Sequence, residues 1–371
     1  MKILVTGGAG FIGSHTVDLL LEQGHKVRVL DNLAPPVHRD GRKPDYLPDE
    51  VDFRLGDVRN RNDIVAALRG IDVVFHLAAY QDYLTDFSTF ASVNDVGTAL
   101  LYEIIVNQHL PVQKVIVASS QAVYGEGKYL CEEHGVQYPL ARTLDQLEQG
   151  NWEVQCDTCG QPMKPQRLDE SHVSPHNQYA VSKYCQELYA LTLGRKHRIP
   201  TVVMRYSITQ GPRQSFFNAY SGILRSFTIR LLKNMPPLIY EDGGQLRDYV
   251  YVGDVVRANL LVMENGAADY HAFNIGGSKP VTVLEYARAL LKITGKNIFP
   301  EVPGQFRYGD SRHTISESSS IEELGWMATT PLEQIIHEYV DWAQSQPEVP
   351  YQSYTTASRV MKQTEVVRTV K

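Results

Sequence analysis

The chain has 371 residues, of which 43% are hydrophobic and 21% charged. This is the composition of a globular protein, not of a disordered, collagen-like or coiled-coil chain. With 36 basic and 42 acidic residues the net charge is −6, which argues against a general nucleic-acid binder. No apolar run reaches the ~18 residues of a membrane span, and the opening residues favour a strand and turn over a signal peptide. We therefore expect a cytoplasmic protein with two lobes.

Short β-branched apolar runs alternate with amphipathic stretches through the first half of the chain. The expected buried strands are residues 3–5, 27–30, 51–55, 73–77, 115–118 and 201–205. The expected helices are residues 12–23, 61–68, 94–107 and 179–193. This alternation predicts a Rossmann-type, doubly wound α/β fold, with a parallel sheet covered by helices on both faces.

The rest of the chain departs from this alternation. A first lobe over residues 1–210 contains an insertion at 126–170, which is polar and rich in Gly and Pro. The irregular pattern of residues 211–345 predicts a smaller, mixed α/β substrate lobe, from which a stretch at about 248–275 returns to the first lobe. The tail, 346–371, lacks a clear apolar period, and we expect it to be loosely attached.

A glycine-rich turn joins the first expected strand to the first expected helix. Gly7, Gly10 and Gly13 have GxxGxxG spacing, which lets the backbone approach a pyrophosphate that the helix N-terminus also attracts. Asp31 ends the second strand, where a carboxylate accepts hydrogen bonds from the ribose of NAD and repels the 2′-phosphate of NADP. The turn therefore favours NAD; the alternatives are a plain glycine turn and a capping aspartate.

Tyr179 and Lys183 lie four residues apart and share one face of an expected helix. A tyrosine that acts as a base near pH 7 must lose about 3 units from its ordinary pKa near 10. A neighbouring lysine and the positive nicotinamide ring together favour the phenolate. Ser119 and Ser120 follow the fifth strand, at the sheet edge where ligands bind in such folds. The alternatives are a surface Tyr–Lys pair and two turn serines.

Ten short motifs occur in a fixed order between residues 6 and 310. They are TGGAGFIG (6–13), DNL (31–33), GDV (56–58), HLAA (76–79), NDVGT (94–98), SSQAVYG (119–125), YAVSK (179–183), GPRQ (211–214), RDYVYVGD (247–254) and FRYGD (306–310). In these motifs the chain resembles the extended short-chain dehydrogenase/reductase family, in particular its NAD-dependent nucleotide-sugar epimerases and dehydratases. The resemblance extends over residues 1 to about 340.

The resemblance implies roles for particular side chains. The implied catalytic residues are Ser120, Tyr179 and Lys183. The implied NAD site consists of Gly7, Gly10, Phe11, Ile12, Gly13, Asp31, Asn32, Asp57, Val58, Leu77, Ala78, Ala79, Asn94, Tyr179, Lys183 and Tyr206. The implied substrate site consists of Gln81, Ser120, Gln121, Ile208, Gln210, Arg213, Arg247, Arg307 and Asp310. Arginines suit a diphosphate because a guanidinium binds phosphate with two parallel hydrogen bonds.

The resemblance leaves several reactions that share a first step, in which Tyr179 takes the C4 hydroxyl proton and NAD takes the C4 hydride. A 4,6-dehydratase then needs an acid and a base to remove water across C5 and C6. Dehydratases of this family supply them as an Asp-Glu pair directly after the residue that corresponds to Ser120. Gln121 and Ala122 occupy those positions here and cannot transfer a proton. The sequence therefore favours an NAD-dependent 4-epimerase over a dehydratase, an NADPH-linked reductase or a non-catalytic NAD-binding scaffold.

Residues 205–212, which begin at the end of the sixth expected strand, read RYSITQGP. Many epimerases of the family that the chain resembles read RYFNVYGP there. Ile208 replaces the usual Asn and Gln210 the usual Tyr, and an apolar Ile suits a 6-deoxy sugar. Together with the cysteine-bearing insertion, this stretch resembles bacterial sequences assigned as dTDP-L-rhamnose 4-epimerases. We expect a dTDP-6-deoxyhexose such as dTDP-L-rhamnose as the substrate, with UDP-glucose/galactose or UDP-glucuronate as alternatives.

The insertion carries three of the four cysteines in two short motifs. Cys131 and His134 form a CxxH motif, and Cys156 and Cys159 form a CxxC motif, which together offer four ligands for a structural zinc ion in a ribbon-like fold. The alternatives are free thiols and a redox disulfide. Cys185 falls in the Tyr179 helix and is expected to be a packing residue. The family resemblance also implies a homodimer formed through helices of the first lobe.

Overall fold

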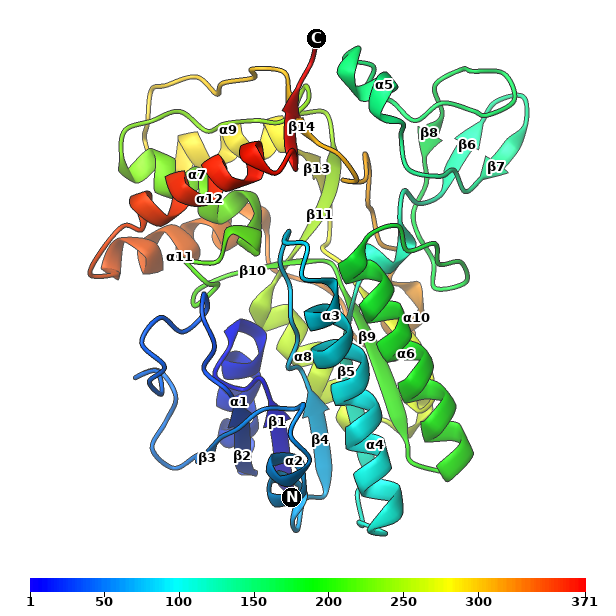
Figure 1. Ribbon diagram of the computed structural model, residues 1–371, viewed down its shortest axis with the longest axis vertical. Coiled ribbons are helices and arrows are strands. Elements are labelled where there is room, and N and C mark those ends of the chain that lie inside the picture. The colour runs from blue at the N-terminus through cyan, green and yellow to red at the C-terminus, as the bar shows by residue number, and fades with distance from the viewer.

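The computed structural model describes residues 1–371, which form one lobe around a large sheet and a second lobe that carries the last helices of the chain (Figure 1). The large sheet has seven strands in the order β12-β9-β5-β4-β1-β2-β3. Their bounds are β1 (Lys2–Thr6), β2 (Lys26–Asp31), β3 (Asp52–Leu55), β4 (Val73–His76), β5 (Lys114–Ser120), β9 (Thr201–Tyr206) and β12 (Ala272–Ile275). All neighbours are parallel, which confirms the Rossmann-type α/β sheet expected from the sequence.

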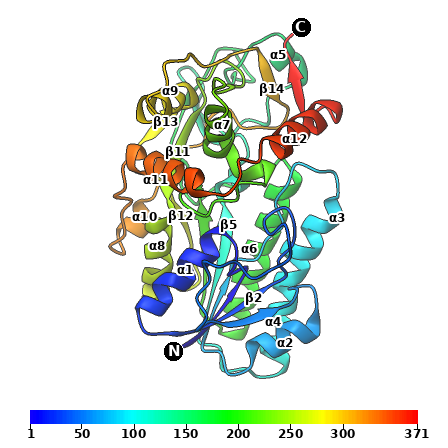
Figure 2. The same ribbon diagram turned by 90° about the vertical axis from the view of Figure 1, so that its left-hand side faces the viewer.

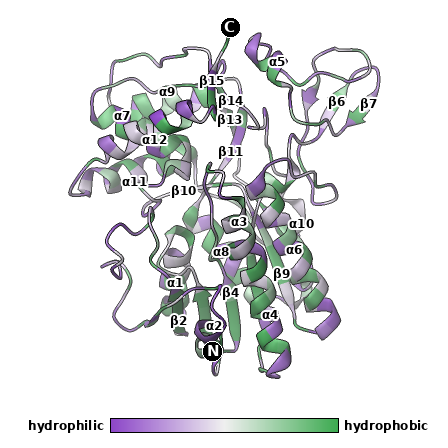
Figure 3. Ribbon diagram, viewed as in Figure 1, coloured by the Kyte–Doolittle hydropathy of each residue, from purple (hydrophilic) through white to green (hydrophobic).

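Helices cover both faces of this sheet (Figure 2). They are α1 (Phe11–Glu22) and α8 (Val252–Glu264) on one face, and α2 (Arg61–Leu68), α4 (Gly97–Asn107) and α6 (Gln178–His197) on the other. Because the central strands are covered from both sides they are largely apolar, as β4 shows in Figure 3. The carboxyl ends of the strands point toward the second lobe (Figure 1).

The second lobe is built on a small sheet with the order β10-β11-β13. Its elements are β10 (Ile208–Gln210), β11 (Leu246–Tyr251), β13 (Pro280–Thr282), α7 (Gly222–Leu232), α9 (Val283–Ile293) and α11 (Leu332–Ser345). A separate core of aromatic and aliphatic side chains, with Phe227, Tyr286 and Tyr339 buried in it, holds these elements together.

The expectation of a loosely attached tail is wrong. Residues after Gln346 form α12 (Tyr351–Gln363), which packs against α7, and β15 (Val367–Thr369), which pairs with β14 (Gln305–Arg307). The attachment depends on backbone pairing and on half-buried side chains, and no residue of α12 is fully buried. The helix has an apolar face but is polar on average, so it is harder to recognise in the sequence as a packed helix than a core helix is.

The insertion forms a small unit beside the second lobe (Figure 1). Its elements are β6 (Tyr129–Cys131), β7 (Gly135–Gln137), α5 (Leu144–Glu148) and β8 (Lys164–Pro165), with the strands in the order β7-β6-β8. The remaining short helices of the chain are α3 (Phe87–Phe90), η1 (Ala91–Val96), η2 (Gln121–Tyr124), η3 (Ala219–Ser221), η4 (Gly266–Ala268) and α10 (Ser319–Glu322). None of the helices combines the length and hydropathy needed to cross a membrane.

Candidate active site

A cavity of ≈ 640 Å³ is lined by residues of both lobes. It begins at the glycine turn after β1, passes the carboxyl ends of β4 and β5, and ends against α7 and α12. The cavity lies where the strand order of the central sheet reverses, with β1 next to β4, and this is the usual ligand crevice of open α/β sheets.

The glycine turn allows a close backbone approach that no larger residue permits. Gly7 has φ +69°, and a Cβ placed there lies 2.7 Å from the amide nitrogen of Ala78. A Cβ on Gly13 lies 2.1 Å from the carbonyl oxygen of Gly7. At Gly10 a Cβ meets nothing closer than 3.3 Å, so this position faces the cavity. The turn thus forms a side-chain-free cradle at the N-terminus of α1.

Two carboxylates border the same end of the cavity. Asp31 ends β2, and its carboxylate accepts hydrogen bonds from the amides of Ala9 (3.0 Å) and Leu33 (2.9 Å), which fix it beside the glycine turn. Asp57 accepts from Asn32 and from the guanidinium of Arg59. This arginine lowers the pKa of Asp57 to about 2, so the carboxylate stays charged at neutral pH.

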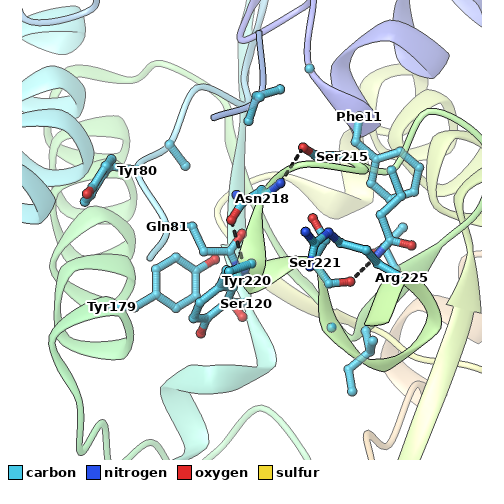
Figure 4. A pocket seen from close by; sticks show the side chains of 18 of the residues that line it. Phe11, Tyr80, Gln81, Ser120, Tyr179, Ser215, Asn218, Tyr220, Ser221 and Arg225 are labelled. Atoms are coloured by element: carbon cyan, nitrogen blue, oxygen red, sulfur yellow. Dashed lines mark hydrogen bonds between the residues drawn. The ribbon is translucent and has the colours of Figure 1, made fainter. Parts of the chain in front are cut away.

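Tyr179 and Ser120 lie side by side in the middle of the cavity (Figure 4). Ser120 ends β5, and Tyr179 is in the first turn of α6, which begins where Asn177 accepts a hydrogen bond from the amide of Ala180. Burial raises the pKa of Tyr179 to about 12, and a hydrogen bond from Ser120 opposes this rise. A tyrosine in this state holds its proton until a positive charge arrives.

Lys183 lies one turn after Tyr179 but is buried behind the cavity wall. Its ammonium donates to the carbonyl of Ala118 and to the amide oxygen of Gln186, each at 2.8 Å. Burial lowers the pKa of Lys183 to about 7. The structure therefore does not bring the Lys183 ammonium into contact with the Tyr179 hydroxyl.

Asn94 is likewise buried, in the π-helix η1, and does not line the cavity. Its side chain exchanges hydrogen bonds with the backbone of Tyr80 and donates to the hydroxyl of Ser182 on α6. The residue thus links the strand-end segment that carries Gln81 to the helix that carries Tyr179. A π-helical turn often occurs at a functional site, and the sequence pattern does not distinguish it from the α-helix expected for residues 94–107.

A row of aromatic side chains leads from Tyr179 toward the second lobe. The ring of Tyr220 lies 5.7 Å from that of Tyr179 and 4.4 Å from that of Tyr83. The guanidinium of Arg307 lies 4.8 Å from the Tyr83 ring and 5.0 Å from the Tyr240 ring, and its Nε is buried without a partner. Sequence reasoning found Arg307 but missed the three tyrosines, which occur outside any recognisable motif.

The other expected substrate residues divide into two groups. Gln81, Gln121, Ile208, Arg247 and Asp310 line the cavity together with Ser120 and Arg307. The structure does not bring Gln210 or Arg213 there: Gln210 accepts a hydrogen bond from the buried Tyr286 hydroxyl, and Arg213 pairs with Asp18 on α1 at 2.6 Å.

Arg247 lines the cavity, yet its guanidinium is engaged by the protein. It donates hydrogen bonds to the carbonyl oxygens of Leu246, Ser311 and Arg312. Arg307 is also engaged, since it donates to the Tyr83 hydroxyl and lies 3.6 Å from the Asp310 carboxylate, but its Nε has no partner in the protein.

The expected metal ligands meet in the insertion, far from Tyr179 in sequence and outside the cavity. The ligand atoms of Cys131, His134, Cys156 and Cys159 all lie within 4.8 Å of one another. His134 Nδ1 is 3.5 Å from the sulfur of Cys131 and 3.5 Å from that of Cys156, and the sulfurs of Cys131 and Cys159 are 3.7 Å apart.

The model of the NAD dependent epimerase/dehydratase family matches residues 3–144 and 154–276. The chain belongs to this family. It is 34% identical to the dTDP-L-rhamnose 4-epimerase of Burkholderia thailandensis over 92% of this chain and 94% of the relative.

Solved structures of family members have the same fold. The UDP-glucose 4-epimerase of Thermotoga maritima, solved with UDP-glucose, has a TM-score of 0.75 at 31% identity and covers 94% of this chain and 100% of its own. The UDP-glucose 4-epimerase of Thermus thermophilus, solved with NAD, has a TM-score of 0.74 at 29% identity and covers 93% of this chain and 99% of its own.

The residues of this chain fit NAD as the cofactor. The cradle of Gly7, Gly10 and Gly13 accepts a pyrophosphate, and Asp31 presents a carboxylate at the end of β2, where a dinucleotide ribose lies in this fold. Phe11, Ile12, Val58, Leu77, Ala79 and Tyr206, all expected from the sequence, line the same cavity.

Proposed function

We propose that the protein is an NAD-dependent nucleotide-sugar 4-epimerase in which Ser120, Tyr179 and Lys183 carry the reaction. One observation supports this most directly. Tyr179 and Ser120 lie together midway along a single cavity that has a dinucleotide cradle at one end and Arg307 toward the other. Such a cavity suits an electron-accepting cofactor and an anionic substrate that meet at one tyrosine.

In the proposed mechanism Tyr179 alone transfers a proton, and Ser120 and Lys183 assist it. The cradle of Gly7, Gly10 and Gly13 would hold NAD, which would supply a reversible hydride acceptor for C4 of the sugar. Tyr179 takes the proton of the C4 hydroxyl and gives it back, while the Ser120 hydroxyl donates a hydrogen bond that stabilises the charge on oxygen. The Lys183 ammonium donates hydrogen bonds to Ala118 and Gln186 and so fixes the turn of α6 that follows Tyr179. In its protonated form it also places a positive charge behind Tyr179.

The residues after Ser120 favour epimerisation over elimination. Loss of water across C5 and C6 requires an acid and a base beside the 4-keto intermediate. Gln121 lines the cavity with a neutral amide, and Ala122 has no polar side-chain atom. Return of the hydride to the other face of the 4-keto sugar needs no further proton donor.

The proposed substrate is a dTDP-6-deoxyhexose such as dTDP-L-rhamnose. Ile208 lines the cavity with an apolar side chain where many relatives have Asn, which favours a sugar with fewer hydroxyls. Similarity to the dTDP-L-rhamnose 4-epimerase supports the same choice. UDP-glucose/galactose and UDP-glucuronate are the alternatives, since UDP-glucose 4-epimerases are comparably similar.

Incubation of the purified protein with dTDP-L-rhamnose, UDP-glucose, UDP-galactose and UDP-glucuronate tests both proposals. We expect the protein to convert dTDP-L-rhamnose to its C4 epimer, and NMR of the product mixture detects this conversion. Turnover of UDP-glucuronate alone would reject the 6-deoxy sugar, and accumulation of a 4-keto-6-deoxy product would reject epimerisation. If no sugar changes the absorbance of bound NAD and none is converted, the proposed substrates are rejected and a non-catalytic NAD-binding scaffold becomes the favoured alternative.

We also propose that the insertion binds a structural zinc ion. A tetrahedral zinc with bonds of ~2.3 Å to sulfur and ~2.0 Å to nitrogen implies ligand separations of about 3.8 Å (S···S) and about 3.5 Å (S···N). The separations of 3.7 Å for Cys131–Cys159 and 3.5 Å for Cys131–His134 and Cys156–His134 match these values, and the other pairs of ligand atoms lie within 4.8 Å. A disulfide, with ~2.05 Å between sulfurs, would use only two of the four groups.

The local backbone suits this proposal. Gly135 and Gly160 follow the second ligand of each motif and have φ +72° and +70°, conformations that favour glycine. Four protein ligands leave no open position, so the ion has a structural role. We expect about one equivalent of zinc in the purified protein and its loss in Cys156→Ser; less than about a tenth of an equivalent in the native protein would reject the site.

Finally, we propose a homodimer formed through α4 and α6. Val181, Leu188 and Tyr189 of α6 are 46%, 49% and 44% exposed, an unusual apolar surface for one helix. Light scattering after gel filtration should give twice the chain mass, and Leu188→Glu should give a monomer. A native monomer would reject the proposal.

A further inference from the structure

The helix α12 supplies one wall of the cavity. Tyr354, Ala357, Ser358 and Met361 all line it, and their i, i+3, i+4, i+7 spacing places them on a single helix face. Each of the four is only half-buried in the chain as it stands. Their face is therefore open to the cavity and not sealed by packing.

The position of α12 along the cavity follows from the row of side chains that begins at Tyr179. Tyr220, Tyr83, Arg307 and Tyr240 succeed one another with separations of 4.4–5.7 Å. Burial raises the pKa of Tyr240, and the nearby hydroxyl of Tyr354 adds to the rise. α12 thus lies beyond Arg307, at the end of the cavity that is opposite the cofactor cradle.

A nucleotide sugar has its reacting carbon, its diphosphate and its nucleoside in that order along its length. With the sugar at Tyr179 and the diphosphate at Arg307, the nucleoside must occupy the end of the cavity at α12. There the walls are apolar, formed by Leu238 and Val283 as well as by Ala357 and Met361. A flat base packs well between an aromatic ring, a thioether and aliphatic groups.

We propose that α12 forms the nucleoside-binding wall of the substrate site, with Ala357 and Met361 against the base and with Ser358 available to a polar edge. This proposal rests on the proposed function, because it takes the ligand to be a nucleoside diphosphate sugar. The wall is held in place by β15, whose pairing with β14 joins the segment after α12 to the strand that carries Arg307. The part of the site proposed to bind the nucleoside is therefore attached, through β15 and β14, to the part proposed to bind the diphosphate.

Calorimetric titration of the NAD-bound protein with dTDP and with UDP tests the proposal. Ala357→Trp places a large ring in the nucleoside space, so we expect the Kd for dTDP to rise by about tenfold or more. Thr356→Trp is the matched control, since Thr356 is exposed on the same helix and does not line the cavity. Met361→Ala should weaken binding severalfold by removing a contact without blocking the space.

Further measurements separate a local effect from misfolding. NAD content and melting temperature should be the same in Ala357→Trp, Thr356→Trp and the native protein, and Ala357→Trp should raise KM with kcat retained at saturation. Equal dTDP affinity in all three proteins would overturn the α12 proposal and leave the proposed function standing. Failure of the native protein to bind either nucleoside diphosphate would instead overturn the proposed function.

Discussion

Burial drives the pKa values of Tyr179 and Lys183 apart, raising that of Tyr179 to about 12 and lowering that of Lys183 to about 7. Both shifts disfavour the charged form, which has no water to solvate it at these positions. In the ligand-free site Tyr179 is therefore protonated near neutral pH and cannot accept a proton. The positive charge that activates it has to come with the cofactor or from a rearrangement of Lys183.

Removal of the Tyr179 hydroxyl should abolish the proton transfer and nothing else. We expect Tyr179→Phe to lower kcat by roughly 10²–10⁴-fold, with NAD content and melting temperature unchanged. Ser120→Ala should cause a smaller loss, because it removes a hydrogen bond and leaves the base. Turnover in Tyr179→Phe within about tenfold of the native rate would contradict the assignment of Tyr179 as the base.

The depressed pKa of Lys183 has a consequence for stability. Between pH 7 and about 10, the unfolded chain carries a proton on this lysine that the folded chain lacks, so the free energy of unfolding rises with pH. Relative to Lys183→Met, the native protein without NAD should gain as much as ~1.4 kcal/mol per pH unit over this range. Urea unfolding at pH 7 and pH 9 measures the difference, and a difference independent of pH would contradict it.

The site residues that could be predicted from the sequence lie in short motifs. Gly7, Asp31, Ser120 and Ile208 line the cavity as expected, because each follows a strand whose carboxyl end reaches it. Tyr220 was not predictable in this way. It lies in η3, within an irregular stretch of the chain whose path over Tyr179 depends on contacts distant in sequence.

At the scale of elements, the insertion is joined to the second lobe by a buried ion pair. Arg142 of the insertion donates hydrogen bonds to both carboxylate oxygens of Glu241, at 2.9 and 3.1 Å, and the two side chains are 2% and 3% exposed. Arg312 donates to the same carboxylate at 2.8 Å. A charge buried this completely is costly to leave without its partner.

Arg142→Met should therefore destabilise the protein by about 3 kcal/mol, because Glu241 loses two hydrogen bonds without regaining water. Chemical denaturation measures the change. Arg167→Met is the control, since its guanidinium is 47% exposed and lies 4.0 Å from Glu317, and it should cost less than about 1 kcal/mol. Equal effects of the two substitutions would show that the buried pair contributes little.

The elements themselves were predictable where periodicity is strong. The helix expected at residues 61–68 has those bounds in α2, and the expected strands of the first lobe appear as β1 to β5 and β9. The expected helix at residues 94–107 instead begins as the π-helix η1 and continues as α4. One extra residue per turn shifts the ladder of hydrogen bonds but hardly alters the apolar pattern from which the helix was inferred.

For the whole molecule, the two lobes enclose one cavity in which oxidation and reduction of the sugar would both occur. In a hydride mechanism the hydrogen of C4 would stay bonded to carbon throughout, and such a hydrogen does not exchange with water. We expect substrate deuterated at C4 to keep its label in both the starting sugar and the epimer, as mass spectrometry can show. Washout of the label into water during turnover would contradict a hydride mechanism within one site.

The Rossmann-type lobe was predictable at this scale because alternating strands and helices in parallel order leave few possible arrangements. The cavity wall formed by α12 was not. It requires residues 351–363 to return across α7, and only three-dimensional packing determines that path.

The pairing of β14 with β15 also bears on the order in which the molecule can be built during synthesis. Every strand of the large sheet has been made once Ile275 is added, and its core is complete once Ile321 and Trp326 follow, so the cofactor lobe can fold while the ribosome is still working. The strand carrying Arg307 has no partner until residues 367–369 emerge. A nascent chain would thus acquire its cofactor cradle well before it could hold a sugar nucleotide.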